Sequence, residues 1–182
     1  MARVYPEYDY DLPEELFEEL GDLSSAVLLG GLSRQAGAEE ELTGFFRSYG
    51  TRVAEKVLKA GKKYKDRTYE VLEEAARKTG LAFPGIYQRF VEIWLLATRP
   101  QDKWKIVEST ARRFVFTVQD CSVYRLVREK YPAAAFLPCG EGCLAFLNGI
   151  SEKLGLPVTA EIDKEMTSDG SCRFRCELQG QK

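Results

Sequence analysis

The sequence contains no histidine among its 182 residues. This absence excludes serine–histidine–aspartate and cysteine–histidine catalysis, zinc sites of the HExxH type and iron bound through imidazole. A general acid or base in this chain would have to be an aspartate, glutamate, lysine, tyrosine, cysteine or bound water. The absence of histidine therefore restricts the possible chemistry more than any other feature of the composition.

The chain also has no strong excess of either charge and no long apolar run, and we expect no leader sequence. Lys and Arg number 26 against 28 Asp and Glu, so nucleic acid is a poor expected partner. No run approaches the roughly 20 apolar residues of a membrane span, and the acidic start MARVYPEYDYDLPEEL resembles neither a signal nor a transit peptide. We therefore expect a globular cytoplasmic protein without a membrane span.

The apolar residues predict a helical first half and a mixed second half. We expect an extended aromatic arm over 1–12 and one α+β domain over 13–182. Within that domain, 13–100 is predicted to be mainly helical, and 113–178 is the mixed half, which carries all five cysteines.

Helical periodicity is clearest over 38–60, where Gly50 would allow a neighbouring element to pack closely. The segment Gly61–Lys65 that follows is interpreted as a basic connector. The helix predicted over Ile86–Ala97 is apolar nearly all round, which places it either at the centre of the domain or in a subunit interface.

The second half alternates strand and helix patterns. Residues 103–112 fit a helix or a strand equally well, whereas Phe114, Phe116 and Val118 lie on one face of a strand. Two more strands flank Asp169-Gly170, a hairpin turn signal, and their polar faces carry opposite charges. The predicted fold is α+β: N-terminal helices packed on a small antiparallel sheet, with a C-terminal strand-helix-helix-hairpin unit.

The cysteines are the main candidates for chemistry. Their odd number, without a secretory signal, favours reduced thiols over disulfides. Cys139 is predicted to lie at a helix N-terminus, where the dipole favours thiolate and suits a nucleophile, a metal ligand or an anion contact. Cys121 ends a strand and could face the same crevice. Cys143 and Cys176 lie on apolar faces and are predicted to be core residues.

Three kinds of site are possible, each beside a purely structural alternative. A catalytic site would use Cys139 as nucleophile, with Cys121, Glu141 or Asp120 handling protons. A zinc site could combine Cys121, Cys139 and Cys172 with a carboxylate. A ligand pocket could be lined by aromatic residues that would fit a plain core equally well: Tyr87, Phe90, Trp94 and Trp104.

The C-terminal half resembles the 4-vinyl-reductase-like small-molecule-binding domain superfamily, over about residues 45–178. The shared features are a Cys or Gly-rich helix start, a G-x-P-V step, a strand Glu and a G-x-x-C-x-F ending. In this chain they are Cys139-Gly140-Glu141-Gly142, Gly155-Leu156-Pro157-Val158, Glu161 and Gly170-Ser171-Cys172-Arg173-Phe174. The helix Arg47–Leu58 is similar to an earlier glycine-containing helix of that family.

The branch of 2-amino-thiazoline-4-carboxylate hydrolase-like proteins is similar to at least the same degree. The matching segments are Asp120-Cys121-Ser122-Val123-Tyr124, Leu137-Pro138-Cys139 and Cys172-Arg173-Phe174. Zinc-binding members of the superfamily carry a further cysteine three residues after the strand Glu, where this chain has Lys164.

The resemblance implies a homodimer and a pocket for a small hydrophobic or aromatic molecule. It leaves three functional alternatives open: a binding domain with Cys139 at the pocket mouth, a hydrolase of a small cyclic C–N or C–S substrate, and a structural dimerisation domain. Zinc is a possible cofactor in the second alternative.

Overall fold

The structure is a computed structural model that describes residues 12–32, 39–132 and 137–180. The arm predicted over 1–12 therefore lies outside the described residues, apart from Leu12. The elements in the described ranges are α1 (Glu14–Leu20), the short helix η1 (Gly21–Leu23), α2 (Ser25–Leu32), α3 (Glu39–Lys63), α4 (Arg67–Thr79), α5 (Gly85–Thr98), β1 (Lys103–Ser109), β2 (Arg113–Asp120), α6 (Ser122–Lys130), α7 (Cys139–Leu154), β3 (Val158–Lys164), α8 (Met166–Asp169) and β4 (Cys172–Leu178).

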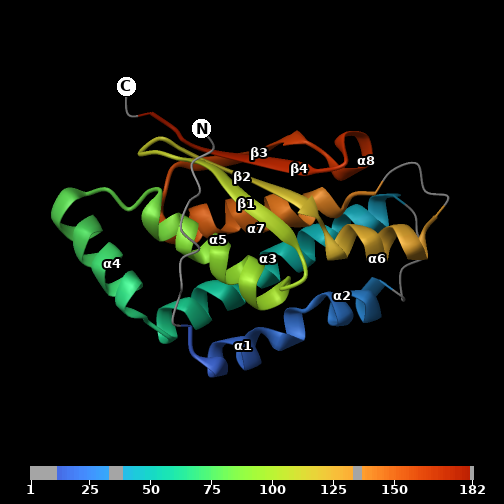
Figure 1. The fold of residues 1–182 in the computed structure, drawn as a ribbon, viewed down its shortest axis with the longest axis horizontal. Helices are drawn as coiled ribbons and strands as arrows, with labels where there is room; N and C mark the ends of the chain where they lie inside the picture. The colour runs from blue at the N-terminus through green and yellow to red at the C-terminus, as the bar shows by residue number, and fades with distance from the viewer. Residues whose placement is uncertain (1–11, 33–38, 133–136, 181–182) are drawn as a thin grey trace.

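The helices lie on one side of a four-stranded sheet (Figure 1). Helix α7 packs against β3 and along α3, and α5 lies beside both helices. In Figure 1, α1 and α2 lie furthest from the sheet, and α4 projects at one side. This arrangement confirms the predicted α+β class, with mainly helices in the first half and the sheet formed by the second half.

The sheet has the strand order β1-β2-β4-β3, and every pairing is antiparallel. Alternation turns Phe114, Phe116 and Phe174 into the core, where the rings of Phe116 and Phe174 stack at 5.0 Å. On the outer face Arg175 and Glu161 are cross-strand partners that form an ion pair at 2.6 Å. The opposite charges on the predicted hairpin therefore are neighbours across two strands.

Three local details differ from the sequence interpretation or complete it. Residues 103–109, open between helix and strand, form β1. Helix α3 continues to Lys63, so the connector interpretation of Gly61–Lys65 is wrong for most of that segment. Gly61 packs against Phe90 of α5, where an added Cβ would stand 2.7 Å from a ring carbon. Asp169 is the last residue of the single-turn helix α8 and Gly170 is its left-handed C-cap, so the predicted turn is the end of a longer connection.

Helices α3 and α7 cross at two glycines. A Cβ on Gly50 would lie 2.0 Å from the carbonyl oxygen of Gly142. Only glycine allows the two backbones to approach this closely, and the close packing predicted at Gly50 is thereby confirmed. Because Gly142 belongs to the first turn of α7, this crossing also fixes where that helix begins.

Helix α5 occupies the centre of the domain rather than a free surface. Tyr87, Phe90 and Trp94 are each at most 1% exposed, and most other residues of α5 are buried. The charge of Arg89 is satisfied inside, by the carboxylate of Asp66 at 3.1 Å. Of the two places that the sequence allowed for this helix, the structure selects the centre, so α5 is not available as a dimer interface.

In the parts of the chain that the structure describes, no helix combines the length and apolarity needed to cross a membrane.

Candidate functional site

Cys139 is the first residue of α7, and Pro138 precedes it as the N-cap residue. The predicted position of this thiol at a helix start is therefore confirmed. Its side chain is partly buried and lines a pocket of about 40 Å³. The pocket is lined by Tyr124, Leu137, Pro138, Cys139, Gly140, Glu141, Ile162, Glu165, Met166, Thr167 and Cys172.

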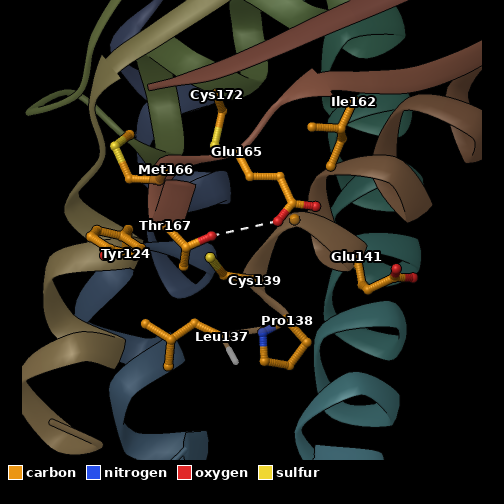
Figure 2. A pocket seen from close by; sticks show the side chains of 11 residues that line it. Tyr124, Leu137, Pro138, Cys139, Glu141, Ile162, Glu165, Met166, Thr167 and Cys172 are labelled. Carbon is orange, nitrogen blue, oxygen red and sulfur yellow. Dashed lines mark hydrogen bonds between the residues drawn. The ribbon is translucent and has the colours of Figure 1, made fainter. Parts of the chain in front are cut away.

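Three segments distant in the sequence meet around this pocket: α6 through Tyr124, the start of α7, and the connection between β3 and β4 that contains α8. Figure 2 shows the thiols of Cys139 and Cys172 pointing toward one another, with Thr167 and Glu165 beside them. The volume provides room for about three water molecules. The site is thus a small cavity at the end of the sheet, with thiols in its wall.

Burial raises the pKa of the Cys139 thiol well above its ordinary value, and the neighbouring thiols of Cys121, Cys143 and Cys172 raise it further. The charge of Arg99 acts in the opposite direction without offsetting this loss of solvation. The expectation of a thiolate at this helix start is therefore wrong. Desolvation disfavours the charged form more than the partial charge of the helix end favours it.

The three residues predicted to handle protons beside Cys139 all have structural partners, and Asp120 pairs with Arg125 Nη1 at 3.3 Å. Cys121 is 7% exposed and is the N-cap residue of α6, where its sulfur accepts a hydrogen bond from the Tyr124 amide at 3.4 Å. It does not line the pocket. Glu141 does line it, but its carboxylate is paired with Arg47 Nε at 2.8 Å. The structure thus brings Cys139 and Glu141 to one pocket, whereas Cys121 is not among the residues that line it.

The predicted zinc ligands do not form a metal centre. Within residues 12–32, 39–132 and 137–180, no group of three or more Cys, Asp or Glu side chains lies close enough to hold a metal ion. Cys139 and Cys172 line the same pocket, whereas Cys121 does not. In the described residues, Cys121, Cys139 and Cys172 therefore do not form the three-ligand group that the sequence predicted.

The predicted ligand-binding aromatics are core residues. The Trp94 ring stacks on Phe146 at 4.1 Å, and the Tyr87 hydroxyl donates to the Leu147 carbonyl at 3.1 Å. Phe90 is fully buried, and Trp104 is a partly buried residue of β1. None of the four lines the pocket beside Cys139. Tyr87, Phe90 and Trp94 are therefore placed as a plain core would place them, and Trp104 packs against that core from β1.

Cys143 and Cys176 are buried at 6% and 0% exposure, as their positions on apolar faces predict. Cys143 has a partner that the sequence did not reveal: Arg99 Nη2 lies 3.6 Å from its sulfur. The Arg99 guanidinium also lies 4.5 Å from the Trp94 ring and 3.7 Å from the carboxylate of Asp102. The spacing of Arg99 and Asp102, in a polar segment directly after an apolar helix, was the available signal of this buried pair.

Sequence reasoning also missed Tyr124, Glu165, Met166 and Thr167 as pocket residues. Three of them lie in the connection between β3 and β4, which is longer than a two-residue hairpin turn. That extra length was the one sequence signal that residues of this connection could line a pocket.

Comparison with known proteins does not assign the chain to a family. No family model and no curated protein matches it. A solved structure from work on heme distortion in the H-NOX family aligns over 91% of this chain and 92% of its own, with 13% identity and a TM-score of 0.33. A likeness at this level carries no argument about function.

Proposed function

We propose that the chain is a small-molecule-binding domain and that its ligand occupies the pocket beside Cys139. The observation that carries this proposal is the meeting of α6, α7 and the β3–β4 connection around one cavity. Its lining combines apolar side chains, such as Leu137 and Ile162, with a few polar groups, such as Glu165 and Thr167. That combination is typical of ligand sites, where the apolar wall provides affinity and the polar groups fix orientation.

The protonated state of Cys139 supports binding rather than hydrolysis. A cysteine nucleophile acts as a thiolate or through an adjacent base. Burial raises the pKa of this thiol, and the carboxylate of Glu141 is engaged by Arg47. The environments of Cys139 and Glu141 therefore support the binding proposal better than the hydrolase alternative.

Helix α8 limits the size of the ligand and offers a way to enlarge the pocket. The turn is held by hydrogen bonds within its own segment: the Ser168 hydroxyl and the Glu165 amide both donate to Asp169 Oδ2, at 2.7 and 3.1 Å. The pairing of β3 with β4 does not depend on these bonds. A ligand larger than about three waters would displace α8 while the sheet stays intact.

A screen by protein NMR tests this proposal. Small fragments that bind are expected to shift the amide signals of Cys139 and Cys172 in the 15N-labelled full chain. Thr167→Trp, on the exposed side of the pocket, is expected to abolish the shifts. Thr159→Trp, an exposed β3 position outside the pocket, is the matched control and is expected to preserve them. The proposal is overturned if no fragment shifts these signals, or if Thr167→Trp leaves them unchanged.

The homodimer implied by the family resemblance stays a prediction. Light scattering of the full chain measures it directly, and a monomer mass at all concentrations would contradict it.

A further inference from the structure

The charged side chains that line the pocket are both acidic. Glu141 comes from the first turn of α7, and Glu165 immediately precedes α8. Among the lining residues, all of which belong to the described part of the chain, there is no lysine or arginine. An anionic ligand would therefore meet like charge at the rim, whereas a cationic ligand would be attracted.

The two carboxylates are not equivalent. Glu141 Oε2 lies 2.8 Å from Arg47 Nε, so its charge is already compensated. Glu165 is exposed, and its carboxylate accepts a hydrogen bond from the neutral Thr167 hydroxyl at 3.5 Å (Figure 2). Among the described residues no lysine or arginine forms an ion pair with Glu165. The uncompensated charge at the pocket is therefore that of Glu165.

The remaining wall is neutral and partly apolar. Burial raises the pKa of Cys139 and Cys172, so both thiols are uncharged at neutral pH. Ile162 and Met166 supply apolar surface beside Glu165. The start of α7 contributes about half a positive charge, which is smaller than the full negative charge of the Glu165 carboxylate. The sign of the charge that this pocket accepts is thus decided by one carboxylate.

We propose that the ligand of this pocket is a small organic cation, with an ammonium or amidinium group bound by Glu165 and a short apolar body against Ile162 and Met166. This inference rests on the proposed binding function and adds the charge of the ligand. Glu165 has the role of a specificity-determining residue, because an amine can pair with its carboxylate while a carboxylic acid of the same size cannot.

Three probes of similar size and different charge test the inference: ethylammonium, 1-propanol and propionate. Each is titrated into the 15N-labelled full chain at low salt, and the amide shifts around Cys139, Glu165 and Cys172 are followed. Ethylammonium is expected to bind most tightly and propionate most weakly. Glu165→Gln is expected to weaken ethylammonium by about fivefold, as for an exposed ion pair, without changing propanol. Glu74→Gln, an exposed α4 position paired with Lys78, is the matched control and leaves all three unchanged.

The outcomes separate this inference from the proposed function. If propanol and propionate bind at the pocket as well as ethylammonium does, or if Glu165→Gln has no effect on ethylammonium, the cation inference is overturned while the binding pocket stands. If none of the three probes shifts the pocket signals, both proposals fail. If the amide signals of Glu165→Gln outside the pocket remain dispersed, the variant is folded. Its affinity for ethylammonium can then be compared with that of the wild type.

Discussion

The crossing of α3 and α7 yields the sharpest prediction about stability, through the substitution Gly50→Ala. The added Cβ would stand 2.0 Å from the Gly142 carbonyl oxygen, 2.9 Å from the Gly142 carbonyl carbon and 3.0 Å from the Ala145 Cβ. Nonbonded carbon atoms in good contact are about 3.5 Å apart or more, so the helices would have to separate by on the order of 1 Å. The obstructing atoms are backbone and a short side chain, which cannot swing aside.

The cost follows from this geometry. Overpacking a core site costs about 1–3 kcal/mol, and separating two long packed helices adds lost contacts along their interface. We therefore expect Gly50→Ala to lower the free energy of unfolding by about 3 kcal/mol or more. For a chain of this size that corresponds to a fall in Tm of about 6–12 °C.

Urea and thermal unfolding of the full chain, followed by circular dichroism, measure this effect. Gly44→Ala on the same helix is the matched control, because a Cβ at Gly44 meets nothing within 4 Å. Alanine at such an exposed helical position is expected to stabilise by about 0.5–1 kcal/mol. The reasoning is refuted if Gly50→Ala stays within about 0.5 kcal/mol of wild type, or if the two variants lose stability equally.

Other predictions follow from the site and from the buried charges. Because burial raises its pKa, Cys139 is expected to react with iodoacetamide at pH 7.5 more slowly than free cysteine does, and to react faster as the pH rises. Peptide mapping that finds Cys139 alkylated faster than free cysteine at pH 7.5 would contradict this expectation. Hydrogen bonds from the Ser168 hydroxyl and the Glu165 amide lower the pKa of Asp169. The stabilisation of α8 by Asp169 is thus fully present above the pKa of this residue in the unfolded chain, about 3.9. It is lost as the pH falls through the lower pKa of Asp169 in the folded protein. Faster amide exchange in α8 at acid pH would reveal this loss. Asp66→Ala removes both the N-cap of α4 and the carboxylate partner of fully buried Arg89, and should cost about 3–5 kcal/mol in urea unfolding; a loss below about 1 kcal/mol would disprove the role of this pair.

Features of local pattern were predictable from the sequence. Alternation in the strands predicted that Phe116 and Phe174 face inward and that Cys176 is buried. Helical periodicity predicted the burial of Cys143, and a glycine inside a long apolar face predicted the close crossing at Gly50. These inferences held because each depends only on the direction of a side chain relative to its own backbone, which the period of the element determines.

Features that depend on remote segments were not predictable. The pattern placed Cys139 correctly at a helix start, but its pKa depends on how much water Cys172, Leu137 and α8 exclude from it. The aromatic side chains of α5 fitted a pocket or a core equally well, because periodicity identifies an apolar face without revealing whether protein or ligand covers it. Trp94 is covered by Phe146, a residue far away in the sequence.

The sequence by itself determined that this chain has no imidazole chemistry, and it determined the fold class. Both follow from the sequence because composition and periodicity are local properties of the chain. Only the tertiary structure decided that burial raises the pKa of Cys139, that the predicted zinc ligands form no group of three in the described residues, and that Glu165 carries the uncompensated charge at the pocket. The physical reason is that solvation and charge pairing are sums over neighbours, and here those neighbours come from α3, α6, α7 and the β3–β4 connection.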